Sequence, residues 1–518
     1  MQILKKLSQF ARNKRLIWIQ IIVILLLLCV LKWEWVLKHI NSTLVVTLFA
    51  TIVGGWILMR TIELITNLSF YNRPYLTFEA DTTQVFHLSK EVTTLEYSVG
   101  EKDWEELGTK NVVFGGDRGK LLIRGRSTKG TDGAIVSFAT NAEVVCTGDI
   151  RTLVDYKNCE KVDTSQAKYR RLFQNCKQLV VSPDLPAENL ADFCYYFMFC
   201  DCTSLKIAPR LPANNLTNGC YIGMFYGCIS LKEAPELPAE NLAEECYSHM
   251  FFGCTSLHEV PKLPAKNLAS ECYYYMFSGC TSLENAPELL AENLAERCCF
   301  RMFSGCTSLE NAPVLQAGSL TTGCYSHMFS GCISLKIAPN LPAENLAADC
   351  YAHMFSSCTS LEKIPKLPAE KLANRCYSHM FSGCTSLQKL PLLQAKSLAN
   401  SCYSCMFSGC TSLMCVPILP SESLTFRCYS HMFFGCTSLK TAPKLPAKNL
   451  AVGCYSFMFS GCTSLSEIII SATDLKTVHC THWLEDVSLS GIFYKNKLAQ
   501  WDNTRIIPSG WTVELIDT

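Results

Sequence analysis

Hydrophobic residues recur along most of this chain with a period of 26 residues. The repeated unit has the consensus CYxxMFxGCTSLxxAPxLPAxxLAxx. Eleven units stand in register, and their first cysteines are Cys194, Cys220, Cys246, Cys272, Cys298, Cys324, Cys350, Cys376, Cys402, Cys428 and Cys454. A fixed period of this length predicts a solenoid, in which each unit buries its apolar face only against its neighbours. With the degenerate flanking units, we expect repeats over residues 168–479 and a C-terminal cap over 480–518.

Within a unit, the apolar positions first follow a helical spacing. In one unit, two adjacent ridges at about 100° per residue are formed by Leu242, Cys246 and Met250 and by Ala239, Ala243, Tyr247 and Phe251. Pro238 suits the first turn of such a helix, and Gly253 suits its left-handed C-terminal stop. Pro261 and Pro264 then confine the parallel strand to residues near Leu257–Val260. These patterns predict an α/β solenoid with short parallel strands on the concave side and helices on the convex side.

Before the repeats, over residues 75–160, the hydrophobic period changes to two. Short alternating runs (YLTFEA, TTLEYSV, NVVF, KLLIRG, AIVSFA and AEVVC) are separated by clusters of Gly, Asp, Lys and Thr. Runs of this kind, divided by turn residues, indicate a small β-sandwich. We interpret it as a spacer or an N-terminal cap.

Two apolar runs in residues 1–70 predict a membrane anchor. The first can be extended to about 20 residues, enough to cross about 30 Å of hydrocarbon. We expect a transmembrane helical hairpin, with helices at about 16–37 and 43–66, and therefore an integral membrane protein. A cleaved signal peptide is the alternative for the first run, and a helix lying in the interface is the alternative for the second.

The side of the membrane on which the repeats lie depends on the number of spans. Basic residues precede the first run: Lys5, Lys6, Arg12, Lys14 and Arg15. By the positive-inside rule they place the N-terminus in the cytoplasm. Two spans would then keep the repeats in the cytoplasm, and one span would place them outside.

The motifs resemble one known family. The GCTSL run after an MF pair, with Pro and Leu downstream, resembles the BspA-like leucine-rich-repeat surface proteins of host-associated bacteria. YLTFEA with LEYSV resembles the β domain that precedes their repeats, and GIFYKN with IPSGWTV resembles their C-terminal cap. The resemblance covers about residues 75–518. It implies a leucine-rich-repeat solenoid, adhesion and an extracellular position, although the apolar runs in residues 1–70 differ from the family's usual secretion or lipoprotein signals.

Charge and cysteine content narrow the class further. The formal net charge of +1 lacks the basic excess that nucleic-acid binding normally needs, so we expect no nucleic-acid partner. Of the 31 cysteines, two recur in each unit. If the unit is helical, Cys246 and Cys254 lie about 11 Å apart along the axis, beyond disulfide reach. We therefore expect buried free thiols stacked in ladders, which favour a reducing compartment.

Histidines raise the question of metal chemistry. His249, His327, His353, His379 and His431 each follow a cysteine by three residues. The same position holds Tyr275, Arg301, Cys405 and Phe457 in other units, so it is better explained as a packing edge than as a zinc site. Every Cys/His pair has near copies in neighbouring units, whereas an active site is singular. We expect no metal, no cofactor and no enzymatic activity.

The most variable position of the unit lies between the strand-end proline and the following leucine. Its residues are Arg210, Glu236, Lys262, Glu288, Val314, Asn340, Lys366, Leu392, Ile418 and Lys444. We expect them to point outward on the concave side. They are either a solvated surface or a recognition strip that runs from mixed charge to an apolar patch at Leu392 and Ile418.

These expectations predict a non-catalytic protein that acts by binding. The first hypothesis is an adhesion protein anchored in a membrane, with a protein or glycan ligand on the concave face. The alternative is a membrane-tethered scaffold that faces the cytoplasm and binds intracellular proteins. The fold alone cannot choose between them, because similar solenoids bind many kinds of ligand.

Overall fold

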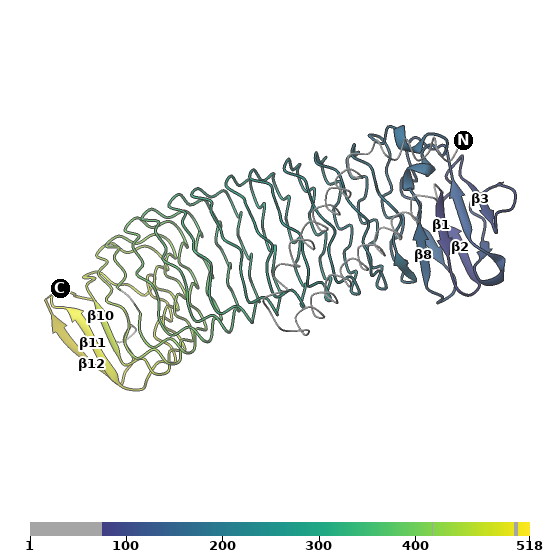
Figure 1. Cartoon of the computed structure of the whole chain (residues 1–518). Helices are drawn as coiled ribbons and strands as arrows, with labels where there is room; N and C mark the ends of the chain where they lie inside the picture. Colours follow the sequence, from purple (N-terminus) through teal and green to yellow (C-terminus); the bar gives the residue numbers. More distant parts are fainter. Residues whose placement is uncertain (1–74, 417, 502–505, 518) are drawn as a thin grey trace, which may run out of the picture. The chain divides into compact units, whose positions relative to one another are not determined.

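The computed structural model describes residues 75–416, 418–501 and 506–517, which belong to one compact unit, Arg73–Thr518. Within this unit a β domain comes first, stacked coils of 26 residues follow, and a small sheet lies at the C-terminal end (Figure 1). We name each coil by its first cysteine, so that the Cys246 coil begins at Cys246.

The β domain is two sheets that pack face to face. The larger sheet has the order β4 (Glu105–Glu106), β3 (Glu96–Val99), β6 (Leu121–Arg124), β1 (Leu76–Glu79), β8 (Val144–Thr147) and β9 (Leu179–Val181). The smaller has the order β5 (Val112–Phe114), β2 (Gln84–Leu88) and β7 (Val136–Phe138). The ring of Phe78 lies 5.3 Å from that of Phe86 and 6.0 Å from that of Phe138, so aromatic side chains fill the space between the sheets.

The β domain continues directly into the solenoid. Strand β9 pairs in parallel with β8, whereas the other strand pairs of the domain are antiparallel. The carbonyl of Lys168 accepts hydrogen bonds from the N–H groups of Thr131 and Asp132, and that of Leu172 accepts one from Val136. The domain therefore covers backbone acceptors that the first coil would otherwise expose.

Around the first cysteine of each coil lies a segment that we call the turn ribbon, residues 244–253 at Cys246. Its backbone has positive φ at every fourth residue, namely Glu245, His249 and Gly253. Between these positions, Ser248 and Met250 donate their N–H groups to carbonyls three residues earlier. The N–H groups of the odd-numbered residues instead reach the next coil. For example, His249 donates to the carbonyl of Tyr274 at 2.8 Å.

The predicted convex helices are therefore wrong. Among the described residues, helical geometry is limited to three short 3-10 helices, η1 (Gly116–Arg118), η2 (Ile150–Leu153) and η3 (Cys159–Lys161). A four-residue turn period and a 3.6-residue helical period direct nearly the same side chains inward over ten residues, so burial alone does not distinguish them. Gly253 is left-handed as expected, but it is the third such residue of a ribbon and not a helix stop. The predicted convex and concave sides were defined by helices and strands, so this assignment is dropped together with the helices.

The predicted membrane hairpin is also corrected. Within the described residues, no helix has the length and apolarity that a membrane span requires. The predicted helices at 16–37 and 43–66 lie outside the described residues. We therefore drop the transmembrane hairpin from the fold and the integral-membrane assignment from the description of the protein.

The core of the solenoid is a set of identical side chains stacked from coil to coil. Tyr247, Met250, Phe251 and Leu257 are at most 2% exposed, and their equivalents in other coils are similarly buried. Tyrosine rings of neighbouring coils stack with centroids 5.7 to 6.3 Å apart. Phenylalanine rings stack at 5.4 to 5.8 Å. Each coil thus buries its apolar face against its neighbours.

Beyond the ribbon, two series of parallel bridges join neighbouring coils in alternation. The first series is Val181↔Ile207, Glu233↔Glu259, Asn285↔Asn311, Ile337↔Lys363 and Thr441↔Glu467. The second is Asn215↔Asn241, Asn267↔Asn293, Ser319↔Asn345, Lys371↔Ser397 and Ser423↔Asn449. A pair of coils joined in one series is open at the position of the other. The strand expected near Leu257–Val260 is thus reduced to a single bridge at Glu259. The pattern of bridges repeats every two coils, except between the Cys376 and Cys402 coils, which neither series joins.

A parallel sheet closes the C-terminal end. It consists of β10 (Glu467–Ile470), β11 (Gly491–Asn496) and β12 (Trp511–Ile516). The ring of Trp483 packs against Phe493 at 6.0 Å. Trp483 also donates from Nε1 to the carbonyl of Ile506 at 2.8 Å, which ties the last coil to the segment before β12.

Candidate functional site

All ten residues of the predicted strip are exposed: Arg210, Glu236, Lys262, Glu288, Val314, Asn340, Lys366, Leu392, Ile418 and Lys444. They form a column, because each occupies the same place in consecutive coils. Within the column, Lys262 Nζ lies 2.9 Å from Glu288 Oε2 of the next coil. The structure thus brings these residues together, and their role in recognition stays a prediction.

Two more exposed positions precede the strip residue in each coil from Cys194 to Cys428, and the sequence interpretation missed them. In the Cys246 coil they are His258 and Glu259, and the strip residue is Lys262. Like the strip, they change in charge and size from coil to coil, which is the signal that could have revealed them. We call the three positions together the variable face.

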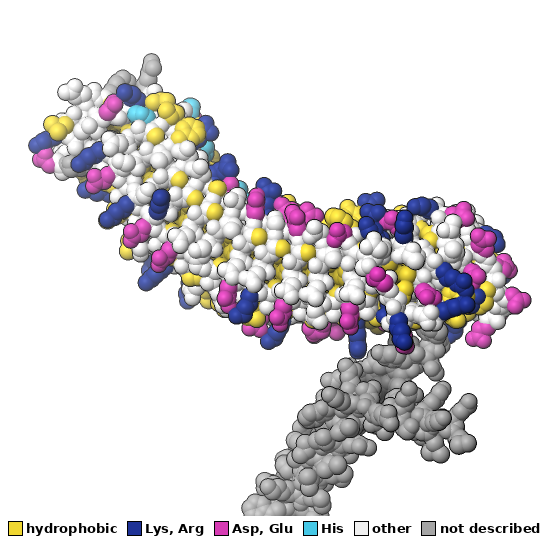
Figure 2. Space-filling model, turned by 90° about the horizontal axis from the view of Figure 1, so that it is seen from above, with side chains coloured by type: hydrophobic (Ala, Val, Ile, Leu, Met, Phe, Trp, Pro, Cys, Tyr) yellow, Lys and Arg dark blue, Asp and Glu magenta, His cyan; other side chains and the backbone are white. Residues whose placement is uncertain are grey.

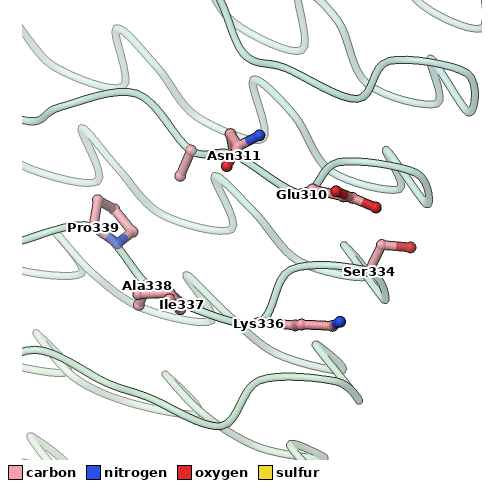
Figure 3. Close-up of a pocket in the computed structure, with 8 residues that line it drawn as sticks. Glu310, Asn311, Ser334, Lys336, Ile337, Ala338 and Pro339 are labelled. Atoms are coloured by element: carbon pink, nitrogen blue, oxygen red, sulfur yellow. The ribbon is translucent and has the colours of Figure 1, made fainter.

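Hollows open on the variable face where the bridge between two coils is absent. Asn311 is bridged to Asn285, and Ile337 is bridged to Lys363, but Asn311 and Ile337 are not bridged to each other. A hollow of about 410 Å³ lies between them. Figure 3 shows Glu310 and Lys336 extending to the same side of this opening from neighbouring coils.

A larger hollow, of about 810 Å³, lies in the stretch between Lys363 and Thr441, where three successive positions of this series lack a bridge. It spans the Cys350, Cys376 and Cys402 coils. Its lining residues include Lys363, Lys389, Leu390 and Pro391. The absence of bridges between these coils thus coincides with a recess in the variable face.

Exposed apolar side chains lie close to this larger hollow, at positions that neighbour its lining residues along the chain or in the next coil. Leu392 is 67% exposed, Met414 is 55% exposed and Ile418 is 62% exposed. Lysines of the variable face accompany them on both sides: Lys336, Lys363, Lys366, Lys389, Lys440 and Lys444. Charged side chains gather along the long edges of the array in the view of Figure 2, with mostly uncharged surface between them. The region from the Cys350 coil to the Cys428 coil therefore combines an apolar centre with a basic surround.

The two cysteines that recur in each coil are buried and poorly reactive. The structure records those of the described residues as free thiols, and nearly all are buried. Burial raises the pKa of the Cys254 thiol to about 12, so the nucleophilic thiolate is disfavoured. The thiol also donates a hydrogen bond to the Phe225 carbonyl, at 3.1 Å. The prediction that the repeat cysteines are buried free thiols stacked in ladders is confirmed.

The histidine column is a stack of rings. His327, His353 and His379 lie with ring centroids 4.2 Å apart and nearly parallel. A histidine nitrogen binds a metal ion in the plane of the imidazole ring. The lone pairs of parallel stacked rings therefore point side by side and do not converge on one metal ion. Within the described residues, no cluster of three or more His, Cys, Asp or Glu side chains could hold a metal ion.

One known protein family matches this chain. The model of the BspA type leucine-rich repeat region matches in six copies, at residues 218–362, 292–414 and 379–504. Together these ranges cover more than half of the chain. The chain belongs to this family. The resemblance seen in the sequence motifs is therefore confirmed, and the fold is a leucine-rich-repeat solenoid.

Solved structures of leucine-rich-repeat proteins are similar to this BspA-type chain only at a distance. The TLR13–ssRNA13 complex has 17% identity and a TM-score of 0.25, and the match covers 68% of this chain and 49% of TLR13. An internalin, InlF of Listeria monocytogenes, has 10% identity, coverage of 51% and 77%, and a TM-score of 0.21. A leucine-rich-repeat protein of Leptospira interrogans has 9% identity, coverage of 71% and 88%, and a TM-score of 0.20.

The chain spans about half the length of the first of these structures. A search of curated proteins gave no match. With TM-scores this low, the structural likenesses add nothing to the family assignment.

Proposed function

We propose that this BspA-type protein is a non-catalytic binding protein whose working surface is the variable face. The observation that carries the proposal is the hollow of about 810 Å³ adjoined by the exposed side chains of Leu392, Met414 and Ile418. Contiguous exposed apolar side chains beside a recess are typical of protein interaction sites. The partner that fits is a protein segment with acidic and apolar side chains.

The apolar centre and the basic surround of the site would have different roles in binding. Apolar anchors that enter the recess would supply affinity, because buried apolar side chains near the middle of an interface dominate its energy. The lysines would steer an acidic segment toward the site and make its association depend on salt. Leu392 tests the first role, and Lys363 and Lys366 test the second.

Four probes separate the possible ligands. They are a synthetic peptide with glutamates and leucines, the same peptide with serine for leucine, its lysine counterpart, and a single-stranded oligonucleotide. We expect the first to bind the full chain at least tenfold more tightly than the others. Binding should be measured by fluorescence anisotropy at two salt concentrations.

Three variants locate the site. Leu392→Ser should weaken the first peptide about tenfold with little change in salt dependence. Lys363→Glu with Lys366→Glu should weaken it and reduce the salt dependence. Glu244→Lys, a charge reversal on the turn ribbon, is the control and should leave binding unchanged. If the oligonucleotide binds as well as the peptide and Leu392→Ser has no effect, the site recognises polyanions and the proposal is wrong.

A further inference from the structure

The variable face carries an acidic stretch between two basic regions. The acidic stretch runs from the Cys220 coil to the Cys298 coil, and its glutamates outnumber Lys232 and Lys262: Glu233, Glu236, Glu259, Glu284, Glu288 and Glu310. Before it, the Cys194 coil carries Lys206 and Arg210. After it, the Cys324 to Cys428 coils carry the lysines of the basic surround, against Glu362 alone. All of these side chains are exposed, so the sign of the surface charge changes twice along the face.

Neighbouring coils of the acidic stretch place carboxylates beside each other. Glu233 is bridged directly to Glu259, and Glu284 and Glu310 occupy the same position in consecutive coils. Within the residues that the structure describes, none of these four side chains forms an ion pair. Like charges at opposed positions of neighbouring strands repel each other and destabilise the pairing. These carboxylates therefore carry charge that no described side chain neutralises.

Opposite charges are set side by side elsewhere in the array. Lys266 Nζ lies 3.0 Å from Glu292 Oε1, and Arg375 Nη2 lies 2.8 Å from Asp349 Oδ2, each across one coil step. The solenoid can thus pair charges between neighbouring coils. Because the four carboxylates of the acidic stretch are left unpaired, they are available to a cationic partner.

The smaller hollow marks the boundary between the acidic stretch and the basic surround. Glu310 and Lys336 line this hollow from neighbouring coils (Figure 3). Two exposed apolar side chains flank the same boundary, Val314 at 68% exposure and Ile337 at 58%. A partner that crosses the boundary would therefore find apolar contacts where the charge of the face changes sign.

We propose that the acidic stretch binds a basic segment of the same partner whose acidic and apolar segment binds at the larger hollow. The proposal rests on the proposed function, because it lengthens the ligand of that site. The partner is then an extended peptide segment that carries, in order, an apolar and acidic part, an apolar residue at the smaller hollow and a basic part. Each part meets the opposite charge, which favours this order of charges over the reverse order.

The spacing of the two charged parts follows from the coil repeat. Neighbouring strands lie about 4.8 Å apart, so the four coil steps from Leu392 to Glu284 span about 20 Å. An extended chain covers about 3.3 Å per residue, so about six residues separate the partner's leucine from its first lysine. On the other side of Leu392 lie Lys440 and Lys444, which would repel a basic extension. Only one end of the bound peptide therefore gains from added lysines.

Extensions of the glutamate and leucine peptide test this arrangement. A run of lysines, placed about six residues from the leucine, is added at the amino end in one peptide and at the carboxyl end in another. Each has a match with serines in place of the lysines. Fluorescence anisotropy with the full chain should show at least tenfold tighter binding for one lysine peptide than for its match, because the second contact becomes intramolecular. The other lysine peptide should bind no more tightly than its match.

Two double variants locate the gain. Glu284→Gln with Glu310→Gln should remove most of it and leave binding of the unextended peptide unchanged. The control is Glu240→Gln with Glu244→Gln, which removes two exposed carboxylates that lie off the variable face and should keep the gain. Thermal unfolding is a second measurement. Because Glu284 and Glu310 repel each other, their replacement should leave the Tm equal or higher.

Three binding results would overturn the proposal: a gain for neither lysine peptide, an equal gain for both, or a gain that survives Glu284→Gln with Glu310→Gln. A lower Tm of this variant would also count against it, because the carboxylates would then stabilise the solenoid itself. If the unextended peptide still binds through Lys363 and Leu392 in these cases, the proposed function stands and only the basic segment is excluded. If the unextended peptide does not bind, the proposed function fails and the longer ligand fails with it.

Discussion

Cys254 Sγ lies 3.1 Å from the carbonyl oxygen of Phe225 in the preceding coil and donates a hydrogen bond to it. The same bond recurs at 3.0 to 3.2 Å in coil after coil, from Cys202 to Cys462. Because each thiol is buried and engaged, it serves as a structural donor between coils. The cysteine therefore contributes to the solenoid both by its size and by its proton.

This arrangement predicts selective thiol chemistry. Cys415 is exposed, whereas Cys246 and Cys254 are buried. In the native protein, a thiol reagent should label Cys415 within minutes and should label the two buried cysteines only after denaturation. Alkylation followed by mass spectrometry measures each site. Rapid labelling of Cys254 in the folded protein, or a disulfide between Cys246 and Cys254 found without reductant, would contradict the prediction.

The histidine stack predicts a loss of stability in acid. Burial, and after it the charge of neighbouring His and Arg side chains, lowers the pKa of His327 to about 3. The same main cause lowers the pKa of His353 to about 4, from the usual 6.5. The unfolded chain therefore takes up protons first as pH falls below about 6.5, and stability decreases progressively toward the folded-state pKa values. Above pH 6.5 both states are neutral at these residues, and their contribution is constant.

Urea unfolding between pH 4 and 7 measures this effect. His353→Phe should reduce the slope of stability against pH, and the column accepts phenylalanine, since Phe457 stacks on His431 at 4.6 Å. Arg301, Asp349 and His379 also act on the stack and remain in both proteins. His258→Phe, at an exposed position, is the control. Equal slopes for wild type and His353→Phe would show that the stack does not set the pH dependence.

The tyrosine column contains a defect that a single substitution should repair. The hydroxyls of Tyr325, Tyr377 and Tyr429 are buried and lack a hydrogen-bond partner within the described residues. Tyr377→Phe removes such a group while keeping the stacked ring, so the free energy of unfolding should stay equal or rise by about 1 kcal/mol. Tyr169→Phe is the comparison, because the Tyr169 hydroxyl lies 3.4 Å from the Ile150 carbonyl. A clear loss of stability in Tyr377→Phe would show that its hydroxyl is bonded.

The alternating bridges predict that coils are best removed in pairs. Deleting residues 376–401 removes one coil and sets the Cys350 coil beside the Cys402 coil, which breaks the alternation of the second series. Deleting 376–427 removes two coils and keeps Lys371 opposite Asn449, so the alternation continues. Each coil removed also takes its buried interface with it, so the single deletion should cost about 1 kcal/mol more than half of what the double deletion costs, the scale of one backbone hydrogen bond. Thermal unfolding monitored by circular dichroism compares both deletions with the full chain, and a single deletion that costs half of the double deletion or less would exclude a two-coil repeat.

The sequence identified the inward side chains but not the backbone that carries them. Tyr247 and Phe251 are buried as predicted, because the preference for burying apolar surface does not depend on the local conformation. Their spacing of four residues suits both a helix and a turn ribbon. The distinction lies in left-handed residues such as Glu245 and His249, which are not glycine. The signal for them is weak and is seen only where other coils have glycine at the same positions, as at Gly219 and Gly223.

For the candidate site, the sequence predicted the column of exposed variable residues but not the hollows beside it. The strip from Arg210 to Lys444 is exposed as predicted, because a variable position between apolar anchors must face outward. The hollows depend on which coils are bridged, and that alternation is invisible in units of nearly constant sequence.

The hydrogen bonds between neighbouring turn ribbons all point the same way. Alternate ribbon N–H groups donate to the next coil toward the C-terminal end, as Tyr247 donates to Cys272. Aligned peptide dipoles add, so the array has a positive end at its last coil and a negative end at its first. The first coil carries Lys168, Arg170 and Arg171, and the last carries Glu485 and Asp486, charges that oppose this dipole. A stack of turns therefore carries the end-to-end polarity that a single long α-helix would have.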